Sequence, residues 1–458
     1  MHTLTRGSYW IFALLAAAGC SSPDSTSPTY LWLDTGHESD TWTAAPETVE
    51  IAIRQTHLDG SESLFKTIEP PTDDAQVQVS LEGADRGWFT VEGLDSSGRV
   101  QVRGSTGLVA PDADLGFPIR VFMARVGRFS RPPSELAESQ GLEPPIALLS
   151  ERFILMAGIP YAYDAAVRID GYDLSRLGLS SPALIPCSRT SCRTKSLVAL
   201  DNGLVLMIGD DWAVWANFAC GSDCTGDLAL PDALEAFSDV AGGKVVRGRD
   251  GTRTIVGATR SDEPTRAILL AHPDNWQAAY LHETPRAGAA ATWVEERGLL
   301  VVGGADDGSG AELWTAEEPY EFNALPYPPD PTRGAGLVAV DGRHVLRVGG
   351  ILEDSEFAPS VLYDLDCTEQ CVPTPFGPPI ELSNVDAFHL GSTVLVFGTG
   401  ADGLNQARLI TADGVETIEL RQPRRGARAL ETARGQVVVV GGELEDDEPA
   451  LTLEIYQD

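Results

Sequence analysis

Seven cysteines offer the clearest chemistry in this chain, and six of them fall into three close pairs. In an oxidising compartment such pairs form local disulfides, each closing a loop of about five residues and contributing about 2 kcal/mol. Zinc is the alternative, but a tetrahedral site would need two of the pairs to converge. We expect three disulfides and no metal: Cys187 with Cys192, Cys220 with Cys224, and Cys367 with Cys371.

The oxidising compartment is inferred from the segment that precedes the seventh cysteine, Cys20. Arg6 is basic, residues 9–18 are apolar, and residues 17–19 are small. Ten apolar residues are too few to span a bilayer, so residues 1–19 are predicted to be an export signal. An ordinary secretory signal with cleavage nearby is one interpretation.

The other interpretation is a lipid anchor. Residues 17–20, AAGC, resemble the bacterial lipobox, and this resemblance implies cleavage before Cys20 and lipidation of its thiol. With Ser21 in place of Asp after the cysteine, the resemblance implies the outer membrane, facing the periplasm or the cell surface. Residues 21–29 are rich in Ser, Thr and Pro, so we predict a flexible tether over residues 20–44. The lipid would be the only membrane contact.

Charge narrows the range of partners. Lys and Arg number 33 and Asp and Glu number 67, for a net charge of −34, which excludes nucleic acid as a plausible partner. Carboxylates gather after a series of glycine turns and would form an acidic rim if those turns share one face. A solvated, repulsive surface is the alternative. The acidic residues are Asp210, Asp211, Asp262, Glu263, Asp306, Asp307, Glu353, Asp354, Glu356, Asp402 and residues 443–448. Calcium is a possible ligand of residues 306–310, although these residues lack the ligand spacing of an EF-hand loop.

Those glycine turns recur at a regular interval. Residues 299–304 read LLVVGG, and similar phrases end at residues 350 and 442. The first glycines, with weaker copies included, are separated by 51, 48, 46, 46, 49 and 43 residues. A period of 40–50 residues with several short strands per unit is typical of a β-propeller. The glycines are Gly158, Gly209, Gly257, Gly303, Gly349, Gly398 and Gly441.

Each unit has four parts that align between copies. The first strand contains small residues, the second ends in glycine, the third ends near a Tyr, and the fourth carries an aromatic residue. Together with an Arg that opens the first strand, these features resemble kelch repeats. The resemblance implies a propeller over residues 127–458. The spacing predicts seven blades, with six or eight as the alternative if a weak unit near Gly209 or Gly257 is misread. The residues are Tyr172, Tyr363, Tyr456, Trp276, Phe322, Arg286, Arg333 and Arg425.

The ends of the array predict how the ring closes. Trp276 and Phe322 each lie 19 residues after their glycine, whereas the same offset from Gly441 falls beyond Asp458. Phe129 lies 29 residues before Gly158, close to the 27 that separate Trp276 and Phe322 from the next glycine. We therefore expect residues 127–136 to supply the outer strand of the final blade, which would cover an exposed sheet edge. Residues 45–126 show short strand patterns typical of a small immunoglobulin-like sandwich.

Signatures of catalysis are absent from the sequence. The seven histidines are scattered, with no HExxH pair, and we find neither a G-x-S-x-G turn nor a phosphate-binding glycine loop. We predict no catalytic, cofactor-binding or metal residues and no cofactor. The expected function is a monomeric, lipid-anchored envelope module that binds a protein or a polysaccharide. The alternative is an envelope hydrolase, lyase or oxidase, which would bring three or more His, Asp, Glu or Tyr side chains together at the central channel.

Overall fold

The computed structural model describes the chain from Thr29 to Asp458 with internal gaps. The described residues are 29–71, 77–107, 109, 118–136, 141–157, 166–180, 183–186, 193–200, 202–218, 225–248, 251–257, 264–271, 278–315, 322–352, 355–432 and 435–458. Within them the protein is all-β, with a short 3₁₀ turn, η2, at Phe237–Asp239. We find no helix in this part of the chain long and apolar enough for a membrane span.

The first domain is a sandwich of two sheets around one core. A three-stranded sheet has the order β4-β1-β7, and a five-stranded sheet has the order β3-β2-β5-β6-β8. In β5 burial alternates residue by residue, so Phe89 and Val91 join a core that also holds Leu31 and Ile51. The strands are β1 (Tyr30–Asp34), β2 (Glu50–His57), β3 (Glu62–Ile68), β4 (Val77–Ser80), β5 (Gly87–Leu94), β6 (Val100–Ser105), β7 (Ile119–Phe122) and β8 (Ala124–Arg125).

The sandwich begins earlier than the sequence predicted. The tether assigned to residues 20–44 is wrong from Tyr30 onward, because β1 pairs with both β4 and β7. Leu31 and Leu33 are buried on this strand, and Trp42 lies in the same core. Burial of these side chains explains why the segment is ordered in spite of its polar neighbours. Residues 1–28, which include the predicted export signal and Cys20, lie outside the described residues.

The rest of the chain forms repeated four-stranded antiparallel sheets. The first three are β10 (Ile146–Leu149), β11 (Phe153–Ala157), β12 (Ala166–Asp173) and β13 (Gly178–Leu179), with β14 (Ala183–Pro186) also on β12; β15 (Ser196–Ala199), β16 (Leu204–Ile208), β17 (Ala213–Asn217) and β18 (Thr225–Asp227); and β19 (Lys244–Arg247), β20 (Arg253–Val256), β21 (Thr265–Ala271) and β22 (Ala278–Arg286).

The later sheets repeat this order with little variation. They are β23 (Ala290–Val294), β24 (Gly298–Val302), β25 (Ala311–Thr315) and β26 (Phe322–Ala324); β27 (Gly336–Ala339), β28 (His344–Val348), β29 (Val361–Asp364) and β30 (Thr374–Pro375); β31 (Ser383–Leu390), β32 (Thr393–Thr399), β33 (Asn405–Thr411) and β34 (Gly414–Ile418); and β36 (Arg428–Glu431), β37 (Gln436–Val440), β39 (Glu454–Gln457) and β9 (Phe129–Ser130). A small ribbon joins β35 (Arg424–Arg425) to β38 (Glu443–Leu444).

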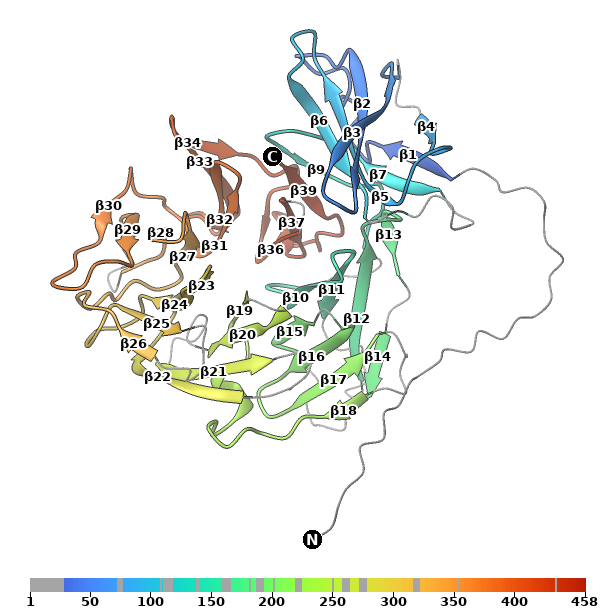
Figure 1. Cartoon of the computed structure of the whole chain (residues 1–458). Helices are drawn as coiled ribbons and strands as arrows, with labels where there is room; N and C mark the ends of the chain where they lie inside the picture. Colours follow the sequence, from blue (N-terminus) through green and yellow to red (C-terminus); the bar gives the residue numbers. More distant parts are fainter. Residues whose placement is uncertain are drawn as a thin grey trace.

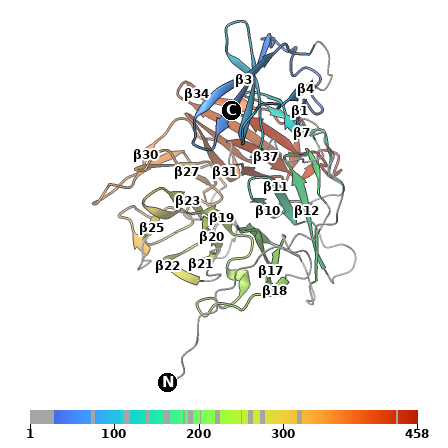
Figure 2. The ribbon, with the colours of Figure 1, turned by 45° about the vertical axis from the view of Figure 1, so that its right-hand side comes forward.

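These sheets stand around a common centre (Figures 1 and 2). Strand β10 lies beside β15, and β19 beside β23; from β23 the contacts continue through β27 and β31 to β36, which returns to β10. Each neighbouring pair buries apolar side chains between its sheets, as in the cluster shared by the sheets of β24 and β28. Repeated four-stranded sheets around a central channel are the architecture of a β-propeller.

The strongest glycine turns are left-handed, as their pairing predicted. After β24, Gly303 and Gly304 have φ of 81° and 66°, and Gly349 and Gly350 after β28 have φ of 61° and 87°. A Cβ on Gly304 would lie 2.3 Å from the carbonyl oxygen of Ala287. The weaker copies differ: Gly398 lies inside β32, so its strand continues past the expected turn. Gly158 lies outside the described residues.

The aromatic residues of the repeat lie where its alignment placed them. Tyr172, Tyr363 and Tyr456 are buried on the third strands β12, β29 and β39, and Phe322 begins the fourth strand β26. Trp276 lies outside the described residues. Cys367 and Cys371 form a disulfide. The other cysteines expected in disulfides, Cys187, Cys192, Cys220 and Cys224, lie outside the described residues.

The sheet of β36 takes its outermost strand from far earlier in the chain. Strand β9 pairs antiparallel with β39, placing Phe129 opposite Tyr456 and Ser130 opposite Ile455. The Phe129 and Tyr456 rings have centroids 5.5 Å apart, and both side chains are fully buried. Strand β9 lies within the segment expected to have this role, residues 127–136. It immediately follows β8, so the sandwich is joined directly to this sheet.

Candidate functional site

A central cavity of about 530 Å³ lies where the first strands of the repeated sheets meet. Strands β10, β15, β19, β23, β27, β31 and β36 each contribute lining residues. Several of these residues are alanines, as expected where strands crowd around an axis. The alanines are Ala147, Ala199, Ala291, Ala387 and Ala429.

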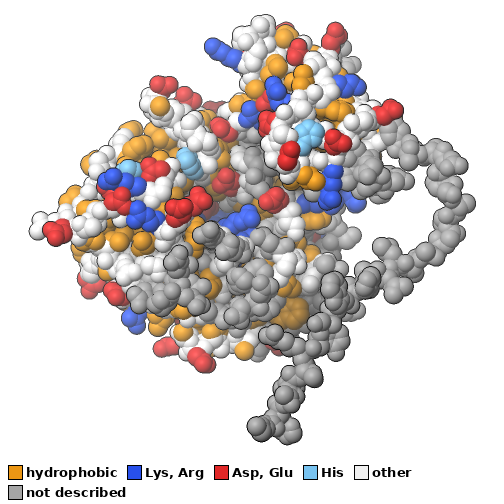
Figure 3. Space-filling model, in the orientation of Figure 1, with side chains coloured by type: hydrophobic (Ala, Val, Ile, Leu, Met, Phe, Trp, Pro, Cys, Tyr) orange, Lys and Arg blue, Asp and Glu red, His pale blue; other side chains and the backbone are white. Residues whose placement is uncertain are grey.

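The charge of the cavity lining is opposite to that of the chain. Five described lining residues are basic and two are acidic, whereas acidic residues outnumber basic ones two to one in the whole sequence. In Figure 3, basic side chains gather near the middle of the face shown, with acidic side chains around them. The basic residues are Lys195, Lys244, Arg247, Arg253 and Arg428, and the acidic ones are Asp386 and Glu431.

One cluster occupies the beginnings of the first strands. Lys244 opens β19 and Arg428 opens β36; both approach Asp386, at 3.7 Å from Nζ to Oδ1 and 3.6 Å from Nη2 to Oδ2. Lys195, just before β15, pairs with Asp210 at 2.7 Å. Distances of 3.6–3.7 Å are too long for strong hydrogen bonds, so Asp386 holds its two cations by charge alone.

A second cluster occupies the far ends of the same strands. Arg247, the last residue of β19, stands opposite Arg253 in the register of β20. Arg253 is buried, and its Nη1 donates to the carbonyl oxygens of Gly251 and Thr252. Trp293 and Phe388 add aromatic surface to the lining.

Some carboxylates of the expected acidic rim are paired with basic side chains. Asp306 lies 3.8 Å from Arg333, and Arg425 contacts both Glu443 and Asp447. Asp262, Glu263, Glu353 and Asp354 lie outside the described residues. Among the residues that the structure describes, no group of three or more His, Cys, Asp or Glu side chains could hold a metal ion. Pairing weakens the field that the rim would otherwise project.

Sequence reasoning missed the cavity cations, although their register carried a signal. Lys244 precedes Gly257 by 13 residues, and Arg428 precedes Gly441 by the same number. Lys195 precedes Gly209 by 14. Counting charged residues at this offset, rather than small residues alone, would have identified the start of three first strands, β15, β19 and β36, as basic.

Of the three arginines expected to open first strands, Arg286 is buried, and Arg333 and Arg425 are partly exposed. Arg286 is fully buried and donates to the carbonyl oxygens of Gly303 (2.8 Å) and Ser309 (2.7 Å), with Glu312 3.3 Å away. In the last repeat the fully buried arginine is Arg424, and its neighbour Arg425 is half exposed. Arg333 is also partly exposed, and Arg347 from β28 occupies the buried site beside Thr332.

His282 belongs to a buried structural cluster. Its Nδ1 lies 3.2 Å from Glu312 Oε2, and both side chains have no exposed surface. Burial lowers the pKa of His282, so the imidazole is neutral near pH 7. Burial raises the pKa of Glu312, but hydrogen bonds and the charge of Arg286 more than offset this and hold it at about 2. His282 lies on β22 and Glu312 on β25 of the next sheet, so we interpret the cluster as a joint between adjacent sheets.

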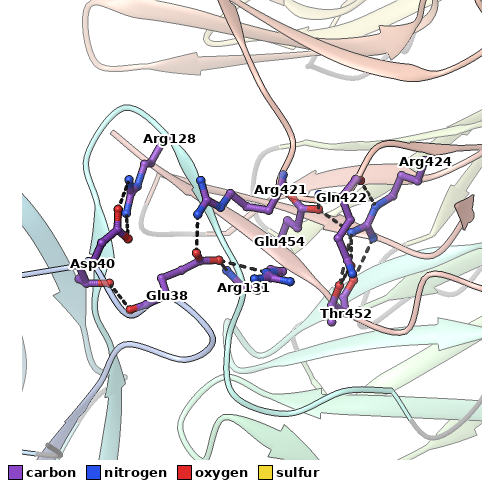
Figure 4. Close-up of polar contacts among 10 residues, drawn as sticks. Glu38, Asp40, Arg128, Arg131, Arg421, Gln422, Arg424, Thr452 and Glu454 are labelled. Atoms are coloured by element: carbon purple, nitrogen blue, oxygen red, sulfur yellow. Dashed lines mark hydrogen bonds and ion pairs between the residues drawn. The ribbon is translucent and has the colours of Figure 1, made fainter. Parts of the chain in front are cut away.

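A second polar network joins the sandwich to the ring (Figure 4). The buried Glu38 carboxylate accepts from Arg131 Nε at 3.1 Å and from Arg421 Nη2 at 2.7 Å. Burial alone would raise the pKa of Glu38, but the hydrogen bonds from Arg421 and Arg131 outweigh this effect and hold the pKa below its usual value. The carboxyl group is therefore ionised. Asp40 accepts two bonds from Arg128. The sandwich is therefore fixed to the connection that enters the last sheet.

The same network continues into the interior of that sheet. Glu454 has no exposed surface and accepts from the backbone nitrogens of Arg421 (2.7 Å) and Gln422 (2.9 Å). Arg424 Nη2 donates to Glu454 at 2.6 Å, and Nη1 donates to the carbonyl oxygen of Thr452 at 2.9 Å. Figure 4 shows these side chains converging between the connecting segment and β39.

Comparison with known proteins gives no family. The sequence matches no family model and no curated protein. A chain in the crystal structure of the mitotic checkpoint complex is 9% identical, with a TM-score of 0.43 over 72% of this chain and 95% of that one. The WD40 domain of Toxoplasma gondii coronin is also 9% identical, with a TM-score of 0.40 over 73% and 87%. Likenesses this weak carry no argument about function.

Proposed function

We propose that residues 127–458 form a seven-bladed, kelch-like propeller that serves as a protein- or polysaccharide-binding module of the cell envelope. The central cavity carries the proposal. Its volume falls within the roughly 300–1,000 Å³ of ordinary ligand sites, and its lining combines aromatic surface with convergent charged groups. Binding in such a site would depend on a few aromatic and basic anchors, with Trp293 the largest aromatic side chain among them.

The lining favours binding over catalysis. Its described residues include two carboxylates, Asp386 and Glu431, and neither His nor Tyr. They lie at opposite ends of the first strands, because Asp386 contacts Arg428 at the start of β36 and Glu431 is the last residue of that strand. A mechanism that uses a pair of carboxylates needs both of them beside one substrate bond. Separate placement supports recognition instead.

Binding is tested by capture with the soluble protein that starts at Ser21. The protein is incubated separately with envelope proteins and envelope polysaccharides, at low and at high salt. We expect a captured component whose recovery falls with Trp293→Ala but not with Trp88→Ala, a matched change in the sandwich strand β5. Loss with Trp88→Ala alone would contradict a ligand site in the ring. Chemical conversion of the captured component would favour the enzymatic alternative.

We also propose that Cys20 carries the lipid that attaches the protein to the outer membrane. About ten residues would then separate the anchor from β1, which begins at Tyr30. The sandwich would act as a spacer between the membrane and the propeller. Cys20→Ser removes the acylated thiol, so the protein should move from the membrane fraction to the soluble fraction. Ser21→Ala is the control and should stay with membranes. Acylation that persists in Cys20→Ser would contradict the anchor.

A further inference from the structure

Three charged residues occupy the same position in three of the repeated sheets. In each of these sheets the charged residue lies opposite the residue that precedes the first glycine of the turn. The three residues are Lys244 on β19, Asp386 on β31 and Arg428 on β36. One layer around the centre of the ring therefore carries all three charges. In the other repeated sheets this position holds an uncharged residue: Pro145, Ser196, Ala290 or Gly336.

The ion pair between Lys244 and Asp386 crosses the ring. Contacts between the first strands run from β19 through β23 and β27 to β31, so the sheets of β19 and β31 are not neighbours. Lys244 Nζ nevertheless lies 3.7 Å from Asp386 Oδ1, and Arg428 Nη2 lies 3.6 Å from Oδ2. The three side chains are only 11–22% exposed although they line the central cavity. They therefore fill the middle of the ring in this layer.

The cavity extends from this layer toward the far ends of the first strands. Pro144, Lys195 and Gly243 each precede the shared position by one residue. Most of the other lining residues follow it, among them Trp293 and Arg247. The charged layer thus lies near one end of the cavity, and most of the cavity lies on the side of Trp293.

The sandwich stands beside the turns at those far ends. A second cavity, of about 620 Å³, lies between the two domains. The ring contributes Glu151, Gly391 and Gly435, each from a turn between a first and a second strand, and the sandwich contributes Trp88 and Arg103. A ligand that enters the central cavity at this end approaches it beside the sandwich.

The cost of burying charge indicates that the ion pairs do more than stabilise the ring. Desolvation of buried ion pairs is expensive, and well-packed apolar side chains of similar volume are often at least as stabilising. We propose that Lys244, Asp386 and Arg428 form a plug that closes one end of the central cavity, so that a ligand enters only at the end beside the sandwich. The inference rests on the proposed binding function and assigns the entrance to its site. A cavity with one entrance admits a side chain or the end of a polymer and excludes a chain that threads through the ring.

The test compares how fast N-ethylmaleimide labels two cysteines introduced on β10, in the soluble protein that starts at Ser21. Ile146→Cys lies one residue beyond the layer of the plug, and Leu148→Cys lies two residues farther, about 7 Å along the strand. Both side chains line the cavity, are partly exposed and pack against the same cluster. Mass spectrometry of peptides separates their labelling from that of the native cysteines. We expect Leu148→Cys to react faster, because the reagent enters from its side.

Removing the plug should abolish this difference. Asp386→Asn should raise the labelling rate at Ile146→Cys about tenfold, as loss of a charged contact predicts, and leave the rate at Leu148→Cys unchanged. Lys244→Met removes the other half of the crossing pair and should act in the same way, which keeps the test available if one variant does not fold.

The matched control is Asp210→Asn. Asp210 pairs with Lys195 of its own repeat at the same end of the cavity, so its loss breaks an ion pair that does not cross the ring. Both labelling rates should stay at their original values in this variant.

Three results would overturn the plug. The first is labelling at Ile146→Cys that is as fast as, or faster than, labelling at Leu148→Cys while the plug is intact. The second is an unchanged rate at Ile146→Cys in both plug variants. The third is an equal increase in the Asp210→Asn control. If envelope capture depends on Trp293 while any of these results is found, the plug is wrong and the binding function stands. If labelling behaves as expected while capture does not depend on Trp293, the closed end stands and the binding function is wrong.

Discussion

Arg424→Met is expected to lower the free energy of unfolding by about 3–5 kcal/mol, because it leaves a buried carboxylate without its cation. Arg424 and Glu454 both have no exposed surface and are joined at 2.6 Å. Met preserves most of the side-chain volume, so the loss measures the missing charge and hydrogen bonds to Thr452 and Glu454 rather than a cavity. Denaturant unfolding followed by tryptophan fluorescence measures the difference.

The neighbouring Arg425→Met is the control. Arg425 pairs with Glu443 at the surface, so its replacement should change stability by no more than about 0.5 kcal/mol. Similar losses in both variants would contradict a special role for the buried pair.

The cost of Arg424→Met should also depend on pH. Burial raises the pKa of Glu454, and Arg424 opposes that rise. Without Arg424 the folded-state pKa rises further above the ordinary value of 4.5, so the folded carboxylate takes up a proton more readily than the unfolded one. Protonation removes the unpaired charge. The gap between variant and wild type should therefore be widest near pH 7, shrink as pH falls through the raised pKa of Glu454, and level off below about 4.5, where the unfolded carboxyl is protonated as well.

Phe129→Ala is expected to cost about 3–5 kcal/mol and to loosen the ring at its closure. Phe129 is fully buried on a strand of two residues, and it packs against Tyr456 and the cluster that contains Phe397. Because β9 has so few backbone bonds, the aromatic contact supplies much of its attachment. Hydrogen exchange measured by mass spectrometry should show faster exchange in Glu454–Gln457.

Phe89→Ala is the matched control for this prediction. Phe89 is equally buried but lies in the sandwich core. Its loss should speed exchange in β2 and β5 and leave β39 protected. Protection of β39 that survives Phe129→Ala would mean that β9 does not hold the sheet.

The repeated strands were predictable because each carries a strong local signal. Apolar runs such as Leu299–Val302 end at paired glycines with positive φ, and the third-strand tyrosines recur in register. Spacing alone also indicated the partner of Phe129. These features depend on one strand and its turn, and a periodic sequence displays them directly.

The remaining features depend on tertiary position, which the sequence does not display. Arg424 and Arg425 are adjacent, and only the direction of one strand decides which guanidinium is buried. Residues 30–34 were assigned to the tether because they form one isolated strand with no neighbouring strand in sequence. Their burial depends on pairing with β4 and β7, which lie far along the chain. The basic cavity was missed because its members come from different sheets, and only Lys195, Lys244 and Arg428 have a similar offset from the glycine turns.

The pairing of β9 with β39 has a kinetic consequence. More than 320 residues separate Phe129 from Tyr456, so this contact has one of the greatest sequence separations in the chain. Long-range pairing slows folding, and its loop-closure entropy must be overcome before the contact gains anything. The sandwich, by contrast, is complete by Arg125. During synthesis the N-terminal sandwich can therefore fold first, whereas β9 can pair with β39 only after the C-terminal strand has been made.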